Sequence, residues 1–163
     1  MLYKTHLAAT YAVALPLLAS TNSLTLGNLI AVGIGSVFPD IDHPKSFIGN
    51  RTRGISDGVG YLFGHRGLAH SILGVLFFLF ASRSLINLLQ LPYAWGDWFI
   101  ASYIAHLIED SFSKNGVAWL QPICNKRIQF GFKVLYYRTG KLNETILLLL
   151  STGAVLYHLS KII

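Results

Sequence analysis

Histidine and aspartate side chains recur in short motifs of a sequence that is otherwise strongly apolar. FPDIDHP spans 38–44, HRGLAHS spans 65–71 and HLIED spans 106–110, and one further histidine stands near the N-terminus. Imidazole and carboxylate groups without thiolates are typical ligands of zinc, manganese or iron. The sequence therefore predicts a divalent metal centre. Its candidate ligands are His6, Asp40, Asp42, His65, His70, His106 and Asp110.

The spacing of His106 and Asp110 is that of neighbours on one helix face. Residues four apart in a helix lie about one turn apart, so both side chains can reach the same ion. Glu109 points to another side of that helix, and we expect it to be solvated or to support a ligand from outside the centre. His65 and His70 lie five apart, which suits a ligand in a loop followed by one at the start of a helix.

The acids of FPDIDHP follow a proline, which favours an extended or turn conformation. Asp40 and Asp42 can ligate or bridge cations there, and the sequence does not choose between them. Each group also has a structural alternative, because histidines near helix ends often form hydrogen bonds and PDID can be a simple turn. Ionisable groups within or beside membrane spans are costly, however, and are functional by default. Their joint occurrence therefore favours a metal centre.

The composition indicates a protein that lies in a bilayer. Of 163 residues, 53% are hydrophobic and 12% are charged, with a mean hydropathy of +0.51, whereas soluble domains are about one quarter charged. With no linker or repeat, we expect one domain over 1–163, an all-α integral membrane bundle of about five hydrophobic helices. The expected helices are roughly 5–20, 24–38, 68–90, 95–113 and 143–160. Alternating aromatic residues suggest a small hairpin near 128–138, and we expect the first helix to be retained rather than cleaved.

The basic residues gather in two loops beside apolar segments. With a net charge of +6, such clusters fit anionic lipid headgroups better than nucleic acid, for which we expect a continuous basic stripe. If the five segments alternate in direction, loops 39–67 and 114–142 share one membrane face with all the candidate ligands. The positive-inside rule assigns this face to the cytoplasm and the C-terminus to the other side. The single Cys124 excludes an internal disulfide and a multi-cysteine metal site.

The order of these motifs resembles that of a known family. TH at 5–6, FPDIDHP at 38–44, HRGLAHS at 65–71 and HLIEDSFSKNGVAWLQP at 106–122 resemble the motifs of the LexA-regulated, membrane-bound, metal-dependent hydrolases of bacterial inner membranes. The order of Asp, His and then His-x-x-x-Asp is more distantly similar to the zinc-dependent phospholipase C and single-strand nuclease group. Those enzymes are all-helical and hydrolyse phosphoesters at zinc ions.

The resemblance implies a ligand set and a metal. The residues most like the shared metal site are Asp40 or Asp42, His70, His106 and Asp110. His6 and His65 would hold a second ion or act as acid–base groups. This chain lacks the later His and Glu ligands of the soluble enzymes, which favours one or two ions, zinc first, with manganese or iron as alternatives.

The expected reaction is hydrolysis of a phosphoester in a membrane lipid or lipid-linked substrate by a metal-activated water. Asp42 or His65 is the candidate general base, and Arg66 is the candidate phosphate clamp. Arg51 and Arg53 either assist this clamp or only contact headgroups. Two other functions stay open: a metal or proton transporter or channel that uses the same cluster, and a non-catalytic lipid-binding protein. The sequence leaves the oligomeric state open.

Overall fold

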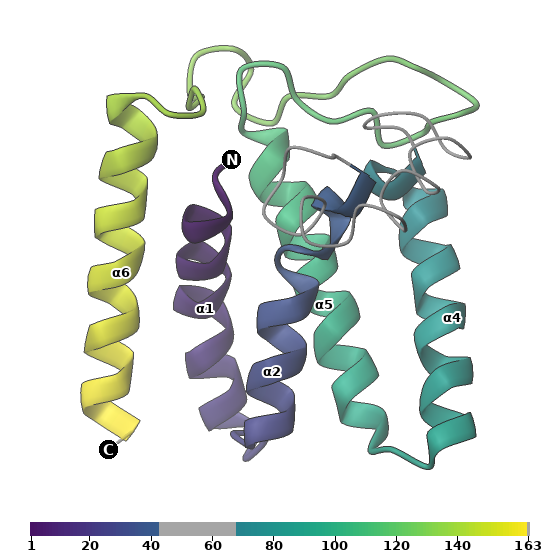
Figure 1. The fold of residues 1–163 in the computed structure, drawn as a ribbon. Coiled ribbons are helices and arrows are strands. Elements are labelled where there is room, and N and C mark those ends of the chain that lie inside the picture. The colour runs from purple at the N-terminus through teal and green to yellow at the C-terminus, as the bar shows by residue number, and fades with distance from the viewer. Residues whose placement is uncertain (43–67, 163) are drawn as a thin grey trace.

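The computed structural model describes residues 1–42 and 68–162, with the backbone alone at Asp42. Within these ranges five α-helices run alternately in opposite directions (Figure 1). They are α1 (Tyr3–Ser20), α2 (Leu26–Gly35), α4 (Ile72–Leu89), α5 (Tyr93–Ser111) and α6 (Leu142–Ile162). Two short 3-10 segments, η1 (Phe38–Asp42) and η2 (Leu68–His70), follow α2 and precede α4. The expectation of an all-α bundle of about five helices is confirmed for the described residues.

The helices pack side by side as a series of neighbours. α6 packs on α1, α1 packs on α2 and α5, α2 packs on α5, and α5 packs on α4, so α6 and α4 form the two edges (Figure 1). A buried cluster of Ala14, Leu18 and Val32 joins α1 to α2, with Trp98 of α5 packed against it. This packing brings the start of α1 and the ends of α2 and α5 to one end of the bundle, where η1 and η2 also lie (Figure 1).

A hydroxyl cap determines where α4 begins. The side chain of Ser71 accepts a hydrogen bond from the backbone N–H of Gly74, and thereby satisfies one of the unpaired donors at the helix start. The backbone of Leu68 lies close to the first turn of α4. A Cβ atom added at Gly74 would lie only 2.2 Å from the carbonyl oxygen of Leu68. The cap and the close approach together hold His70 directly above the first turn of α4.

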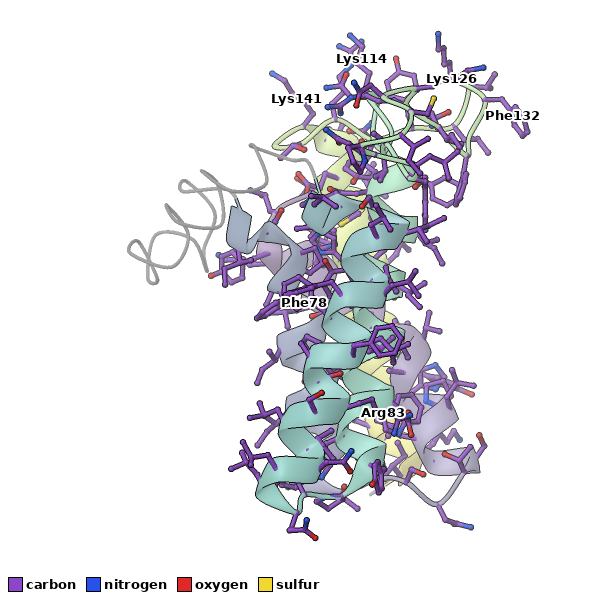
Figure 2. All side chains as sticks on the ribbon, turned by 90° about the vertical axis from the view of Figure 1, so that its right-hand side faces the viewer. Phe78, Arg83, Lys114, Lys126, Phe132 and Lys141 are labelled. Carbon is purple, nitrogen blue, oxygen red and sulfur yellow. The ribbon has the colours of Figure 1, made fainter. Side chains whose placement is uncertain are left out.

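Two of the described helices, α4 and α6, are long and apolar enough to cross a membrane. α2 has ten residues, whereas a perpendicular crossing requires about 20. Lys114, Lys126 and Lys141 gather at the end of the bundle opposite the C-terminus (Figures 1 and 2). Arg83 lies much further along α4 and pairs with Asp97 of α5 (Figure 2). Basic charge in the described residues is therefore concentrated at one end of the bundle.

The predicted hairpin near 128–138 is wrong. Residues 112–141 form successive turns with two isolated bridges, and residue 128 pairs with residue 117 rather than with a neighbouring strand. Val117 and Ile128 exchange backbone hydrogen bonds of 3.0 and 2.8 Å. Phe132 and Lys133 have positive φ angles as in a hairpin turn, but no bridge in the described residues joins the segment before them to the segment after them. The aromatic alternation instead reflects local packing, since Phe130 stacks on Trp119.

Candidate metal centre

Five of the predicted ligands meet at one end of the bundle. The five side chains come from the first turn of α1, from the 3-10 segments η1 and η2, and from the last two turns of α5, which carries two of them. They are His6, Asp40, His70, His106 and Asp110. The convergence follows from the antiparallel order of the helices, which returns the chain to this end after α2 and again after α5 (Figure 1).

Asp40, His70 and His106 offer ligand atoms within 4.8 Å of one another, and Asp110 lies beside this group. Oδ1 of Asp40 lies 3.6 Å from Nε2 of His70 and 3.9 Å from Nε2 of His106. Oδ2 of Asp110 lies 3.9 Å from each of the same two nitrogens. Ligand atoms about 2.0–2.1 Å from a tetrahedral zinc ion stand roughly 3.3–3.4 Å apart. These four separations exceed that spacing by roughly 0.2–0.6 Å, so small side-chain movements would bring each pair to the distance that an ion requires.

A second group of possible ligands overlaps the first at His106. Nε2 of His6 lies 3.4 Å from Oδ1 of Asp110, and His6, His106 and Asp110 offer ligand atoms within 4.8 Å of one another. Asp110 thus presents one oxygen to each group, the arrangement by which a carboxylate bridges two ions. The imidazole rings of His6 and His106 stack with their centroids 3.8 Å apart.

The ring nitrogen of His106 that faces away from the centre, Nδ1, is held by a backbone carbonyl group. Nδ1 of His106 lies 2.8 Å from the carbonyl oxygen of Ser36. Because a carbonyl oxygen only accepts, Nδ1 carries the proton and Nε2 presents a lone pair to the centre. Nε2 of His106 is buried and has no hydrogen-bond partner among the described residues. Buried polar atoms are normally paired, so this nitrogen fits a metal ligand.

Glu109 supports His6 in the same way. Nδ1 of His6 lies 2.5 Å from Oε2 of Glu109, whose other oxygen accepts a hydrogen bond of 2.8 Å from the hydroxyl of Thr10. Within the described part of the chain, Nε2 of His6 has no hydrogen bond either. Carboxylates behind histidine ligands orient the ring and raise its basicity. Of the two expectations for Glu109, support from outside the centre is the one that the structure bears out.

Asp110 is held by a tyrosine from the long loop. Its Oδ1 accepts a hydrogen bond of 2.8 Å from the hydroxyl of Tyr137 and also contacts the ammonium group of Met1 at 3.0 Å. Burial raises the pKa of Tyr137, and the negative charge of Asp110 raises it further. Tyr137 therefore stays protonated and serves as a donor. The sequence analysis missed this residue, because nothing local relates two side chains 27 residues apart.

The environment of Asp40 keeps this carboxylate ionised. Burial favours the neutral acid, but a hydrogen bond with His70 and the nearby imidazoles outweigh burial and hold the pKa of Asp40 well below its usual value. η2 is anchored beside it, because the hydroxyl of Tyr103 donates a hydrogen bond of 2.5 Å to the carbonyl oxygen of Ala69. Of the two acids in PDID, Asp40 thus faces the centre, and the side chain of Asp42 lies outside the described residues.

The other predicted catalytic groups also fall on that part of the chain. His65, Arg66, Arg51 and Arg53 lie outside the described residues, so the general base and the predicted phosphate clamp stay predictions. The described loop supplies three cations that the sequence analysis had not singled out for the site. They are Lys114, Arg127 and Arg138.

Two polar cavities adjoin the centre on the side of the long loop. The smaller, of about 30 Å³, is lined by His70 and Asp110 together with Asn115 and Arg127. It matches the volume that one water molecule occupies in the liquid, about 30 Å³. The larger, of about 240 Å³, also reaches Asp110 and Asn115, and its cations are Lys114 and Arg138. Water and an anionic group can therefore both approach the ligands from this side.

Comparison with known proteins places the chain among bacterial membrane proteins. The family model described as YdjM inner membrane protein matches residues 1–162. The chain belongs to this family. The family description carries the bacterial inner membrane as its location.

Relatives of the family are found in several bacteria. The inner membrane protein YdjM of Escherichia coli K12 is 36% identical over 110 residues, which cover 64% of this chain and 52% of the relative. The Shigella flexneri protein of the same name matches equally. YvsG of Bacillus subtilis is 30% identical over 125 residues, 77% of this chain and 73% of the relative. The chain spans about half the length of the two YdjM proteins, and no solved structure matches it.

Proposed function

We propose that the protein is a metal-dependent hydrolase of the bacterial inner membrane that cleaves a phosphoester in a lipid or lipid-linked substrate. The observation that carries the proposal is the pair of buried Nε2 atoms of His6 and His106, which have no hydrogen-bond partner among the described residues. Each ring is fixed from behind by an acceptor and faces a carboxylate. A zinc ion held here would lower the pKa of a bound water to about 7 and polarise a phosphoryl oxygen.

The donor set suits zinc and also admits manganese or iron. Asp40, His70 and His106 would hold one ion, and His6 with Asp110 would contribute to another. Arg127 in the small cavity, with Lys114 and Arg138 in the larger one, offers positive charge to a phosphate. Asp42 or His65 is proposed as the general base, and Arg66 as a further clamp, from the sequence.

The position of the cluster supports hydrolysis over transport. A transporter or channel that relays ions through this cluster needs ligands near the middle of the membrane and a path to the far side. The His and Asp ligands instead gather at one end of the bundle, beside the basic loop (Figure 1). The positive-inside rule supports a multi-pass orientation with this end in the cytoplasm.

The test compares wild type with His106→Ala and with His158→Ala as a matched control. His158 lies on α6, outside the two ligand groups. Each purified protein is stripped with a chelator and reloaded with zinc, and bound zinc and turnover of bis-p-nitrophenyl phosphate are measured. We expect wild type and the control to bind one or two ions and to turn over the probe, and His106→Ala to lose both. Equal zinc content in all three proteins, or turnover that persists after chelation, overturns the proposal.

A further inference from the structure

An apolar groove lies between α2 and α4, with α5 as its floor. Its volume is about 550 Å³, within the range of roughly 300–1,000 Å³ that is typical of small-molecule sites. Every side chain that lines it is apolar or aromatic except that of Ser82. Small residues leave the space open, because Ala31 of α2, Ala81 of α4 and Gly96 of α5 all lie on its walls.

We expect the groove to lie at the depth of the hydrocarbon core. α4 is one of the two described helices that are apolar enough to span a membrane, and its lining residues run from Phe78 to Ile86, in the middle and lower part of the helix. Among the described residues, no charged side chain lines the groove. An occupant at this depth must therefore be apolar, since polar groups without partners are costly in lipid.

The upper end of the groove reaches the candidate metal centre. Phe38 lines the groove and stands two residues before Asp40 in η1. Tyr103 packs on Phe38 and on Phe78, with ring centroids 6.5 and 5.6 Å apart, and lies one turn before His106 in α5. Figure 2 shows Phe78 projecting from α4 on the side where η1 lies. One aromatic layer thus forms the top of the groove directly beneath the ligands.

The dimensions suit a hydrocarbon chain. The lining residues extend seven positions along α2 and eight along α4, about 10–12 Å at 1.5 Å per residue. A hydrocarbon chain is roughly 4–5 Å across, because carbon atoms contact at about 3.5–4.0 Å. The volume therefore accepts one or two such chains side by side.

We infer that the groove binds an acyl chain of the substrate lipid and thereby holds its phosphoester headgroup at the metal centre. The inference rests on the proposed function, for which it names the substrate class: a phospholipid whose chain enters between α2 and α4. Cations on the far side of the ligands complement this pose, because Lys114, Arg127 and Arg138 line the polar cavities there. The apolar chain of one lipid would thus contact the groove, and its anionic headgroup would contact the cations on the other side of the centre.

The first test fills the groove. Ala81 lines it and is exposed, so Ala81→Trp occupies the space without displacing a buried neighbour. Ser84→Trp is the matched control, since Ser84 is exposed on the same helix and lines none of the described cavities. Each protein is incubated with 1-palmitoyl-2-oleoyl-phosphatidylglycerol in detergent, and bound lipid is counted by native mass spectrometry. The expected result is retention by wild type and Ser84→Trp and about tenfold weaker retention by Ala81→Trp, the cost of excluding roughly two methylene groups.

Two outcomes of this test overturn the inference. One is equal lipid retention by all three proteins. The other is a lipid-free dimer of wild type that Ala81→Trp converts to a monomer, because a second copy of the chain would then cover the groove.

A second test separates the groove from the chemistry. Zinc-loaded proteins are given two p-nitrophenyl phosphodiesters, one with a hexadecyl and one with a methyl group. Ala81→Trp should remove the kcat/KM advantage of the hexadecyl ester and leave the methyl ester unchanged, and Ser84→Trp should leave both unchanged. An unchanged advantage in Ala81→Trp overturns the role of the groove in substrate binding. Failure of wild type on both esters overturns the hydrolase itself, while lipid retention still decides whether the groove binds an acyl chain.

Discussion

Nδ1 of His106 and the carbonyl oxygen of Ser36 lie 2.8 Å apart, which couples α5 to the end of α2. Carbonyl groups in the last turn of a helix have no partner within the helix. The end of α2 therefore offers a free acceptor at the position where a histidine ligand needs one. The contact depends on the close packing of the two helices at Gly35, one residue before Ser36.

Gly35→Ala should destabilise the protein. An added Cβ would lie 2.2 Å from Oγ of Ser102 and 2.3 Å from the carbonyl oxygen of Phe99, so α2 must move away from α5. Overpacking of this kind costs about 1–3 kcal/mol in the free energy of unfolding. The measurement is denaturant unfolding in detergent micelles. Gly153→Ala on α6 is the control, because a Cβ atom there meets no atom within 4 Å. This change should raise the free energy of unfolding by roughly 0.5–1 kcal/mol. Similar effects of both changes would argue against close packing at Gly35.

Glu109→Gln should weaken zinc binding without removing a ligand. The change removes the negative charge behind His6 while it keeps the size of the side chain. Loss of such a supporting group typically costs about 10–100-fold in metal affinity. Zinc affinity is measured by competition with a chelator. Asp97→Asn removes a carboxylate at the other end of the bundle and should leave the affinity unchanged; an unaltered affinity in Glu109→Gln would exclude the supporting role.

Tyr137→Phe should lower both stability and metal affinity. It deletes the hydroxyl that donates to Asp110 and leaves a buried carboxylate oxygen with one donor fewer. Hydrogen bonds to charged groups are worth about 1.5–3 kcal/mol, and we expect a loss of that size in the free energy of unfolding. Tyr136→Phe is the neighbouring control, because the hydroxyl of Tyr136 contacts only the exposed Arg138 at 3.4 Å. Equal losses in the two variants would contradict a specific role for Tyr137.

Arg127→Gln should reduce phosphodiester turnover with little change in bound zinc. Its side chain lines the small cavity beside His70 and Asp110 but belongs to neither ligand group. Loss of a charge-assisted contact of about 1.5–3 kcal/mol corresponds to roughly 10–100-fold in kcat/KM. The measurement pairs steady-state kinetics with zinc analysis. Lys126→Gln, which removes an adjacent exposed charge, is the control. If Lys126→Gln lowers kcat/KM as much as Arg127→Gln does, general electrostatic attraction of the substrate explains the effect.

Features set by short-range geometry could be predicted from the sequence. The i, i+4 spacing of His106 and Asp110 predicted a shared face, and both residues contribute to the candidate centre. The alternation of apolar segments predicted that ligands scattered over the chain meet at one end, because antiparallel helices return there. The hairpin near 128–138 was predicted wrongly, since residue 128 pairs with residue 117 across the loop.

The sequence alone determined the apolar, helical character of the chain and the residue types of the candidate metal centre, because composition and helical periodicity depend only on neighbours along the chain. Tertiary structure decided which groups support the ligands. Glu109 reaches His6 across 103 residues, Ser36 reaches His106 across 70 and Tyr137 reaches Asp110 across 27. Such contacts depend on how each helix is rotated about its axis and how closely it approaches its neighbour. Those quantities follow from the packing of the whole bundle, and no local pattern encodes them.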